Sequence, residues 1–533
     1  MNKVKMTVTV MLILPVFFTA GCSNALGSDD KPGKFTWVAD YLDNHKQTEP
    51  VKIKVSLEKE KDWNYLLATL SHKGRYVDLD LSGSTLPSLA VFNPGENVAG
   101  KYFIVKLTLP DITTSVVNAT VGSSGKLDHY AFEYFWNLAE IGGTHLQSLG
   151  SYSFFGCSDL EKVNFPALTF IGSYAFGGCT SLACMPIPEN AAAIEDGTFA
   201  GCTLLDGITI PDHVARIGNA AFQDSGLTGI SFPGSLTEIA DYAFSGCIVL
   251  ESLVIPENVK RIGNYAFQGC RILDSVIIED GAESIGNNAF QGCWNLGKAE
   301  IPQSVIKIGN YAFQGCRSLG SIIIPENITV VGDWVFSGCT GLMTVVIPDG
   351  AEKIGNYAFQ GCGFSAITIP DNVTVIGNYA FSGCTWLTDI HIPDSVTGIG
   401  TYAFQECNLA TVAIPENSEY KTIESGTFRN CKLIGIVIPD TIAVIGAYAF
   451  DGCRLLGDIT IPVHVTDIKS YAFATCIKLA SVTFDGSIAK SNFSPSDSFP
   501  GDLFDKYFDE ENGGPGTYIT VNPGTNAVWE KTE

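Results

Sequence analysis

Residues Ile255–Cys270 read IPENVKRIGNYAFQGC, and this stretch decides the fold. The pattern I-P-D/E-x-V-x-x-I-G-x-Y-A-F-x-G-C-x-x-L-x-x-I-x recurs at 301–316, 324–339, 347–362 and 369–384. A constant period predicts a solenoid, because one repeat cannot bury its own apolar face, whereas stacked repeats share a core. The phenylalanine of the pattern recurs at intervals of 22–24 residues, at Phe132, Phe154, Phe176, Phe199, Phe222, Phe244, Phe267, Phe290, Phe313, Phe336, Phe359, Phe381, Phe404, Phe428, Phe450 and Phe473.

The sequence of each repeat predicts one strand, followed by a segment that leads the chain back to the start of the next coil. In Leu250–Ile255, Leu253 and Ile255 point inward and Val254 points outward, because side chains alternate along a strand. Pro256 ends the strand, since it has no N–H to donate to a neighbour. Ile262, Phe267 and Cys270 then return to the interior. We therefore expect a β-rich solenoid of about sixteen coils, with a parallel sheet on its concave face and a cap at each end.

The composition of the chain changes at both ends. Residues 1–21 are typical of an export signal, because Lys3 and Lys5 precede an apolar segment. Residues 22–34 have the composition of a flexible tether. Residues 35–126 predict an N-terminal β-α-β cap with irregular first coils: strands at 51–57 and 76–81, a helix at 62–71, and a strand-like segment at 103–110. The repeats occupy 127–484, and 485–533 predict a C-terminal cap in which Trp529 covers the last apolar layer.

The repeats over roughly 127–484 resemble the leucine-rich repeats of the BspA-like (Treponema pallidum-type) family. Ile and Phe take many Leu positions here, and Gly-Cys stands in place of the common asparagine ladder. The resemblance implies a right-handed leucine-rich-repeat coil and a bacterial, often surface-associated protein linked to adhesion. Ala20-Gly21-Cys22 also resembles a lipoprotein cleavage site, although Thr19 replaces the usual Leu. Cys22 is then the lipid-carrying residue; the other interpretation is an ordinary signal peptide.

The formal charge of −24 excludes some partners. Removal of 1–21 deletes two lysines and no acidic residue, so the charge falls from −24 to −26. Such a surface repels nucleic acid and anionic lipid, so no nucleic-acid partner is expected.

One cysteine per repeat forms a column, usually directly after Gly. This use is typical of a small buried apolar residue and favours free thiols, although neighbouring coils bring cysteines within disulfide reach. No Cys-x-x-Cys pair occurs, so no zinc or iron–sulfur site is predicted. Ser225 takes one place in the column, and Cys184 lies outside it. The column is Cys157, Cys179, Cys202, Cys247, Cys270, Cys293, Cys316, Cys339, Cys362, Cys384, Cys407, Cys431, Cys453 and Cys476.

Two further columns carry polar or aromatic groups. The acidic column indicates turn chemistry and solubility, or else a stripe that attracts Ca²⁺ or a basic partner. Its members are Glu189, Asp212, Glu257, Asp280, Glu326, Asp349, Asp371, Asp394, Glu416 and Asp440. The aromatic column indicates a stacked ladder that covers the convex side, or else a surface for carbohydrate or peptide. Its members are Tyr130, Tyr152, Tyr174, Tyr242, Tyr265, Tyr311, Trp334, Tyr357, Tyr379, Tyr402, Tyr448 and Tyr471.

The outward strand positions give the candidate partner-binding face. An exposed apolar strip that crosses several coils indicates an interaction surface, although β-branched residues also favour strands for intrinsic reasons. We define the outward column as Val254, Ile277, Glu300, Ile323, Val346, Thr368, His391 and Val437.

The search for catalytic motifs finds none. The chain has no H-E-x-x-H, no G-x-S-x-G and no dinucleotide fingerprint. Gly95–Lys101 and Gly292–Lys298 match half of a P-loop, but Tyr102 and Ala299 stand where Ser or Thr would hold Mg²⁺. No enzyme activity, cofactor or metal is expected.

The sequence predicts a non-enzymatic, surface-exposed lipoprotein on the outer membrane that binds proteins. By resemblance, its partners are host matrix or cell-surface proteins, or other bacteria. Two alternatives stay open: a structural envelope lipoprotein that faces the periplasm, and an enzyme with an unrecognised site.

Overall fold

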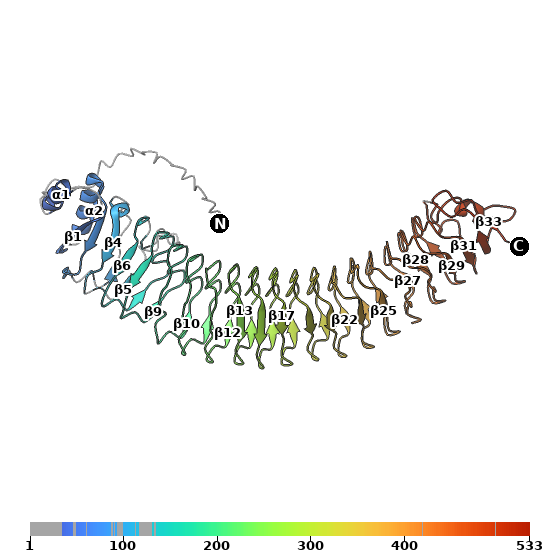
Figure 1. Cartoon of the computed structure of the whole chain (residues 1–533), viewed down its shortest axis with the longest axis horizontal. Helices are drawn as coiled ribbons and strands as arrows, with labels where there is room; N and C mark the ends of the chain where they lie inside the picture. The colour runs from blue at the N-terminus through green and yellow to red at the C-terminus, as the bar shows by residue number, and fades with distance from the viewer. Residues whose placement is uncertain are drawn as a thin grey trace, which may run out of the picture.

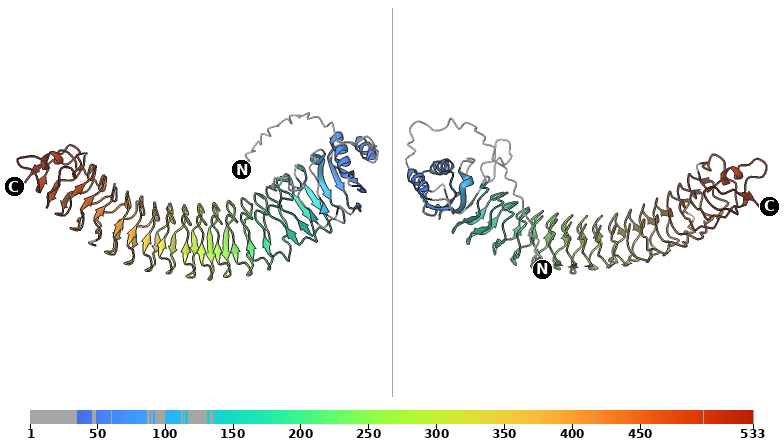
Figure 2. Two further views of the ribbon diagram at one scale, coloured as in Figure 1. Left: turned by 180° about the vertical axis from the view of Figure 1, so that it is seen from behind. Right: turned by 45° about the horizontal axis from the view of Figure 1, so that its top comes forward.

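The chain forms a long arc of stacked coils (Figure 1). The computed structural model describes residues 35–45, 49–59, 61–86, 89, 91–92, 100–111, 113, 115–116, 131–132, 135–417, 419–495 and 497–532. The arc has about 17 turns, and the views from behind and with the top tilted forward show the same curved stack (Figure 2). The predicted parallel β-solenoid is therefore confirmed. Within the described residues, no helix combines the length and apolar character needed to cross a membrane.

Where the predicted strand of a coil forms, it belongs to a ladder that we call the long ladder; the coils of Ala413 and Val437 have only an isolated bridge there. Its strands pair in parallel from coil to coil, so that Leu253 lies opposite Val276 and Val254 opposite Ile277. They are β1 (Val51–Lys54), β2 (Val77–Asp80), β4 (Ile104–Thr108), β6 (Glu140–Gly142), β8 (Lys162–Asn164), β13 (Ser252–Ile255), β15 (Ser275–Ile278), β17 (Lys298–Glu300), β19 (Ser321–Ile323), β21 (Thr344–Val346), β23 (Ala366–Thr368), β25 (Asp389–His391), β29 (Asp458–Ile461) and β31 (Ser481–Phe484).

A second, short ladder of two-residue strands follows the proline turn of each coil. It was not predicted, because two residues give no alternation to detect. Arg261 is exposed and Ile262 is buried, and they pair in parallel with Ser284 and Ile285. The strands are β3 (Val91–Phe92), β5 (Ser115–Val116), β7 (Ser148–Leu149), β9 (Phe170–Ile171), β10 (Ala193–Ile194), β11 (Arg216–Ile217), β12 (Glu238–Ile239), β14 (Arg261–Ile262), β16 (Ser284–Ile285), β18 (Lys307–Ile308), β20 (Val330–Val331), β22 (Lys353–Ile354), β24 (Val375–Ile376), β26 (Gly398–Ile399), β27 (Thr422–Ile423), β28 (Val444–Ile445) and β30 (Asp467–Ile468).

A continuous stack of phenylalanine rings fills the interior. Neighbouring rings are nearly parallel, with centroids 5.4 Å apart for Phe267 and Phe290 and 5.3 Å apart for Phe290 and Phe313. Each of these side chains is fully buried. The backbone adds a matching ladder, in which the Phe267 N–H donates to the Ala289 carbonyl at 2.8 Å. Ring stacking and amide bonding therefore repeat together along the arc.

The N-terminal end begins with two helices. α2 (Asp62–Lys73) joins the parallel strands β1 and β2 in a β-α-β order. α1 (Thr36–Asp43) was not predicted; it buries Val38 and Leu42 and is joined to α2 by an ion pair between Asp43 and Lys73. A short 3₁₀ helix, η2 (Lys101–Phe103), precedes β4. The helices lie at the start of the stack (Figure 1).

The C-terminal end closes the stack by reversing the chain direction. Phe499 adds one more ring, 4.6 Å from that of Phe473, although the sequence period stops before it. After the helix α3 (Leu503–Tyr507), β32 (Gly516–Ile519) pairs antiparallel with β31, and β33 (Glu530–Lys531) pairs antiparallel with β32. Trp529 is fully buried, and its indole N–H donates to the Pro500 carbonyl at 2.8 Å. A short, charged last strand is a poor template for further pairing.

Candidate functional site

All eight side chains of the outward column are exposed, as the alternation of the strands predicted. The apolar members keep large exposed fractions: 50% for Val254, 61% for Ile323 and 80% for Val437. These fractions show that no described loop of the chain covers the column. The residue before or after each member is buried, so the long ladder separates core from surface cleanly.

The outward column is not uniform along the arc. Val254 lies opposite Ile277, and Ile323 lies opposite Val346, which gives two short apolar pairs. Between them, the Glu300 carboxylate pairs with the Lys298 amine at 2.5 Å on the same exposed face. Thr368 lies opposite His391 further along. The arrangement suits contact with a protein surface that is mixed apolar and polar.

The fourteen cysteines of the column are free and buried, whereas Cys184 is exposed. Every thiol of the column lies within bonding distance of the phenylalanine carbonyl of the preceding coil; the Sγ to O distance is 3.3 Å from Cys270 to Phe244 and 3.2 Å from Cys293 to Phe267. Sequence reasoning treated these residues as apolar filler and missed this ladder. Burial raises the pKa of the Cys339 thiol to about 12, so this thiol is a poor nucleophile and a poor metal ligand.

In the part of the chain that the structure describes, the rings of the aromatic column stack as predicted, but in separate runs, because residues without a ring interrupt the column; Tyr130 lies outside the described residues. Ring centroids are 3.9 Å apart for Trp334 and Tyr357 and 4.7 Å apart for Tyr357 and Tyr379. The φ angles of the described members lie between 55° and 62°, in the left-handed region that side chains rarely adopt. In two coils a glycine takes the position of the aromatic residue. Gly197 lies against the ring of Tyr174, and Gly426 lies against the ring of Tyr402.

A polar ladder of Asn and Asp side chains runs beside the aromatic column, at a different position of the repeat from the Gly-Cys pair, and sequence reasoning missed it. The Asn264 Oδ1 accepts from the Asn287 N–H at 2.9 Å, and the Asn287 Oδ1 accepts from the Asn310 N–H at 2.9 Å. The ladder continues through Asp333, Asn356 and Asn378 to Thr401. The G-N-Y-A-F pattern held this signal, since Asn precedes the aromatic residue in coil after coil.

The acidic column lies in exposed turns. In one of these turns the Asp394 Oδ1 accepts from the Glu416 N–H of the next coil at 3.1 Å. Among the described residues, no group of three or more His, Cys, Asp or Glu side chains converges as a metal site would need. The calcium interpretation therefore gains no support from the geometry.

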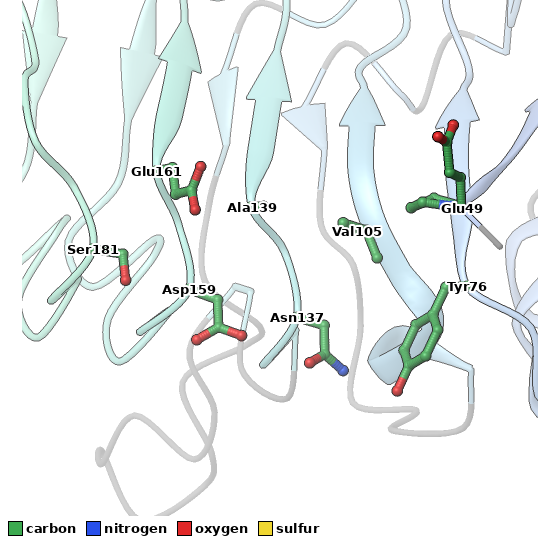
Figure 3. Close-up of a pocket in the computed structure, with 9 residues that line it drawn as sticks. Glu49, Tyr76, Val105, Asn137, Ala139, Asp159, Glu161 and Ser181 are labelled. Atoms are coloured by element: carbon green, nitrogen blue, oxygen red, sulfur yellow. The ribbon is translucent and has the colours of Figure 1, made fainter. Parts of the chain in front are cut away.

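A cavity of about 440 Å³ lies at the start of the first long strands (Figure 3). Glu49, Asp159 and Glu161 line it, together with Tyr76 and Asn137. The figure shows these side chains spread over successive strands instead of gathered on one point.

Cys22, the predicted signal and tether, and most of Gly95–Lys101 lie outside the described residues. The other P-loop-like stretch, Gly292–Lys298, leads into strand β17 and not into a helix, so it cannot form a phosphate-binding loop of that type.

Comparison with known proteins places these features in a family context. A model described as the BspA type leucine rich repeat region (6 copies) matches residues 125–251, 237–365, 352–421 and 421–497. No curated protein matches the sequence.

Among solved structures, a leucine-rich repeat protein from Bacteroides ovatus is 24% identical, with 71% of this chain and 79% of that chain covered and a TM-score of 0.42. A leucine rich cell surface protein from Faecalibacterium prausnitzii is 31% identical, with 47% and 84% covered and a TM-score of 0.34. The leucine-rich repeat protein of T. pallidum is 30% identical, with 34% and 78% covered and a TM-score of 0.26.

Proposed function

We propose that this chain, which belongs to the BspA-type leucine-rich repeat family, is a non-enzymatic adhesion protein of the bacterial surface. A lipid on Cys22 holds it on the outer membrane, and the outward column binds proteins of the host matrix, of host cells or of other bacteria. One observation carries the proposal: side chains of five strands in one continuous sheet, Val254 to Val346, stay exposed with mostly apolar character.

The physical argument rests on area and repetition. A solenoid presents a long surface to which many weak contacts add, so no single deep pocket is needed. Exposed apolar side chains next to an ion pair match the mixture found in protein interfaces. The family resemblance and the cell-surface relative support the location, and the Ala-Gly-Cys sequence supports the anchor.

Binding is tested by replacing two apolar members of the outward column. Purified protein is applied to a panel of immobilised extracellular-matrix proteins, and the affinity of the best binder is measured. Ile323→Glu/Val346→Glu is expected to weaken binding at least tenfold or so, because charges then enter a desolvated contact. The matched control is Val330→Glu/Val375→Glu, which changes exposed valines of the short ladder. Equal losses in both variants would contradict the proposed face.

Location is tested by protease treatment of intact cells. Digestion of this protein while a periplasmic marker survives supports the adhesin. Survival until the outer membrane is opened supports the second candidate, a structural envelope lipoprotein that faces the periplasm. Cys22→Ser is expected to move the protein from the membrane to the soluble fraction; membrane retention by this variant would contradict the lipid anchor.

A further inference from the structure

A groove of about 630 Å³ is lined by residues of six successive coils at the Gly-Cys turns, away from the outward column. Three columns line it. Glutamines form the first, at Gln268, Gln291 and Gln314; glycines form the second, from Gly246 to Gly338; and the residues after the column cysteines form the third. The glycines have φ angles between 67° and 76° from Gly246 to Gly361, so this turn favours residues without a side chain and the backbone stays open.

The third column contains an arginine–tryptophan–arginine sandwich. The guanidinium carbons of Arg271 and Arg317, from the coils on either side, lie 4.7 Å and 5.2 Å from the ring centroid of Trp294. Stacking on an aromatic ring holds a guanidinium plane in place and leaves its N–H edge available. The groove therefore presents two fixed forks of N–H donors.

These two arginines differ from others in the chain. Arg261 is neutralised by Glu238 at 2.7 Å and Asp241 at 3.0 Å. Arg216 is likewise paired with Glu195 and Asp196. Within the described residues, neither Arg271 nor Arg317 has an ion-pair partner, and Asp224 is the one carboxylate among the groove's lining residues. In a chain with a charge of −24, the groove is locally positive.

The glutamine column adds donors along the groove. The Gln268 Nε2 donates to the Gln291 Oε1 at 2.6 Å, and the Gln291 Nε2 donates to the Gln314 Oε1 at 2.5 Å. Each carboxamide has two N–H groups, and this ladder uses only one. The second N–H is available for the carbonyls of an extended chain.

We propose that the groove binds an acidic peptide segment in an extended, polyproline-like conformation, with carboxylates at every third residue. The two arginines stand two coils apart, which is about 9.6 Å at the usual strand spacing of about 4.8 Å. Carboxylates three residues apart on a polyproline II helix are separated by about 9.3 Å and share one side of it. Each guanidinium fork matches one carboxylate in two parallel hydrogen bonds. The two guanidinium groups leave 43% of Trp294 exposed, so a sugar that stacks on its ring is the competing ligand that the test includes.

The test uses a fluorescein-labelled peptide of Glu-Pro-Pro repeats and the purified full chain, with fluorescence anisotropy as the readout. We expect saturable binding that falls at least tenfold or so in Arg271→Gln/Arg317→Gln, because two charge-assisted contacts are lost. The matched control is Arg454→Gln, which changes an arginine at the same position after its cysteine but outside the groove. This control is expected to leave the affinity for the peptide unchanged. The Ile323→Glu/Val346→Glu variant, which changes two residues of the outward column, is also expected to bind the peptide with unchanged affinity.

Several results would overturn the proposal. They are the absence of saturable binding, equal binding of a Gln-Pro-Pro peptide, full affinity in Arg271→Lys/Arg317→Lys, and stronger competition by an oligogalacturonate than by the unlabelled peptide. The lysine variant keeps both charges but loses the planar guanidinium groups. If it bound the peptide as tightly as the unaltered protein, charge attraction alone would explain the binding. The proposal does not rest on adhesion by the outward column. The Ile323→Glu/Val346→Glu variant distinguishes failure of the groove proposal from failure of the adhesion proposal, because it changes only the outward column.

Discussion

The central coils (residues 241–405) and the irregular coils (residues 182–232) share one interior but differ in their outer hydrogen bonding. The phenylalanine stack passes through both, with ring centroids 5.5 Å apart for Phe199 and Phe222 and 5.3 Å apart for Phe381 and Phe404. The long ladder does not: it has no strand between Asn164 and Ser252, a stretch that the structure describes in full. Continuity of the solenoid therefore depends on the interior more than on the outer strands.

Local residues explain part of the difference. Pro186 stands at the strand position of its coil, two residues before the usual proline, and removes an N–H donor. Phe232 takes the place of a buried Ile; its ring is half-buried and packs edge-on against Phe244 at 5.7 Å. Cavities of about 270 and 480 Å³ border these coils. The polar ladder also stops at Asn219, whose Oδ1 accepts no hydrogen bond from the next coil among the described residues.

The largest expected effect tests what the two regions share. Burial raises the pKa of Cys202 in the irregular coils and Cys339 in the central coils to about 12. The unfolded chain has thiol pKa values near 8.5. The protonated thiol is thus favoured in the folded state, so stability is full below about pH 8.5 and falls as pH rises toward 12. Between these two pKa values, each such thiol lowers the free energy of unfolding by about 1.4 kcal/mol per pH unit.

Both regions should therefore unfold together above pH 9, as followed by circular dichroism and peptide-resolved hydrogen exchange. Cys339→Ser removes one titrating group and should reduce the slope by about 1.4 kcal/mol per pH unit. Exposed Cys184 should react with iodoacetamide at pH 8 while the buried column stays protected. Unfolding of the irregular coils at a clearly lower pH would show that the long ladder, and not the shared interior, limits stability.

The second effect compares one ring in each region. Phe290→Ala and Phe199→Ala each remove a fully buried stacked side chain, and each should destabilise its coil and its neighbours by about 3–5 kcal/mol. Hydrogen exchange of the adjacent amides measures the local loss. A loss at Phe199 smaller by more than about 2 kcal/mol would indicate that the cavities around the irregular coils let them relax, which would break the equivalence of the two interiors.

The smallest effect concerns the polar ladder. Asn310→Ala removes the acceptor for the Asp333 N–H, a bond of 3.0 Å, and should cost about 0.5–1.5 kcal/mol. The control is Asn219→Ala, which loses only a side-chain donor to Asp196 at 3.1 Å. We expect a smaller loss there, measured by thermal unfolding of both variants. Equal losses would mean that the ladder adds nothing to the central coils beyond a surface contact.

The sequence predicted what repetition itself imposes. A fixed period places Phe290 and Phe313 in the same environment, and the alternation of Leu253, Val254 and Ile255 predicts which side chain is exposed. Contacts between coils were harder to foresee, because they depend on which atoms of one coil lie above those of the next. The thiol–carbonyl bond of Cys270, the ladder at Asn287 and the extra ring of Phe499 all belong to this class. The left-handed backbone at Tyr265 also has no local signal, since Ala220 and Asn288 adopt it at the same place in their coils without an aromatic ring.

The thiol, asparagine and phenylalanine ladders have a consequence for the genetics of the chain. In the central coils, each coil contacts the coil before it and the coil after it through the same Phe, Cys and Asn positions. A whole coil can therefore be deleted without creating a new kind of interface. Deletion of residues 287–309 joins Gly286 to Asn310, and Phe267 then meets Phe313 while the Cys316 thiol faces the Phe267 carbonyl. In-frame recombination between such coils changes the length of the protein and the spacing of its surface residues while the fold is retained.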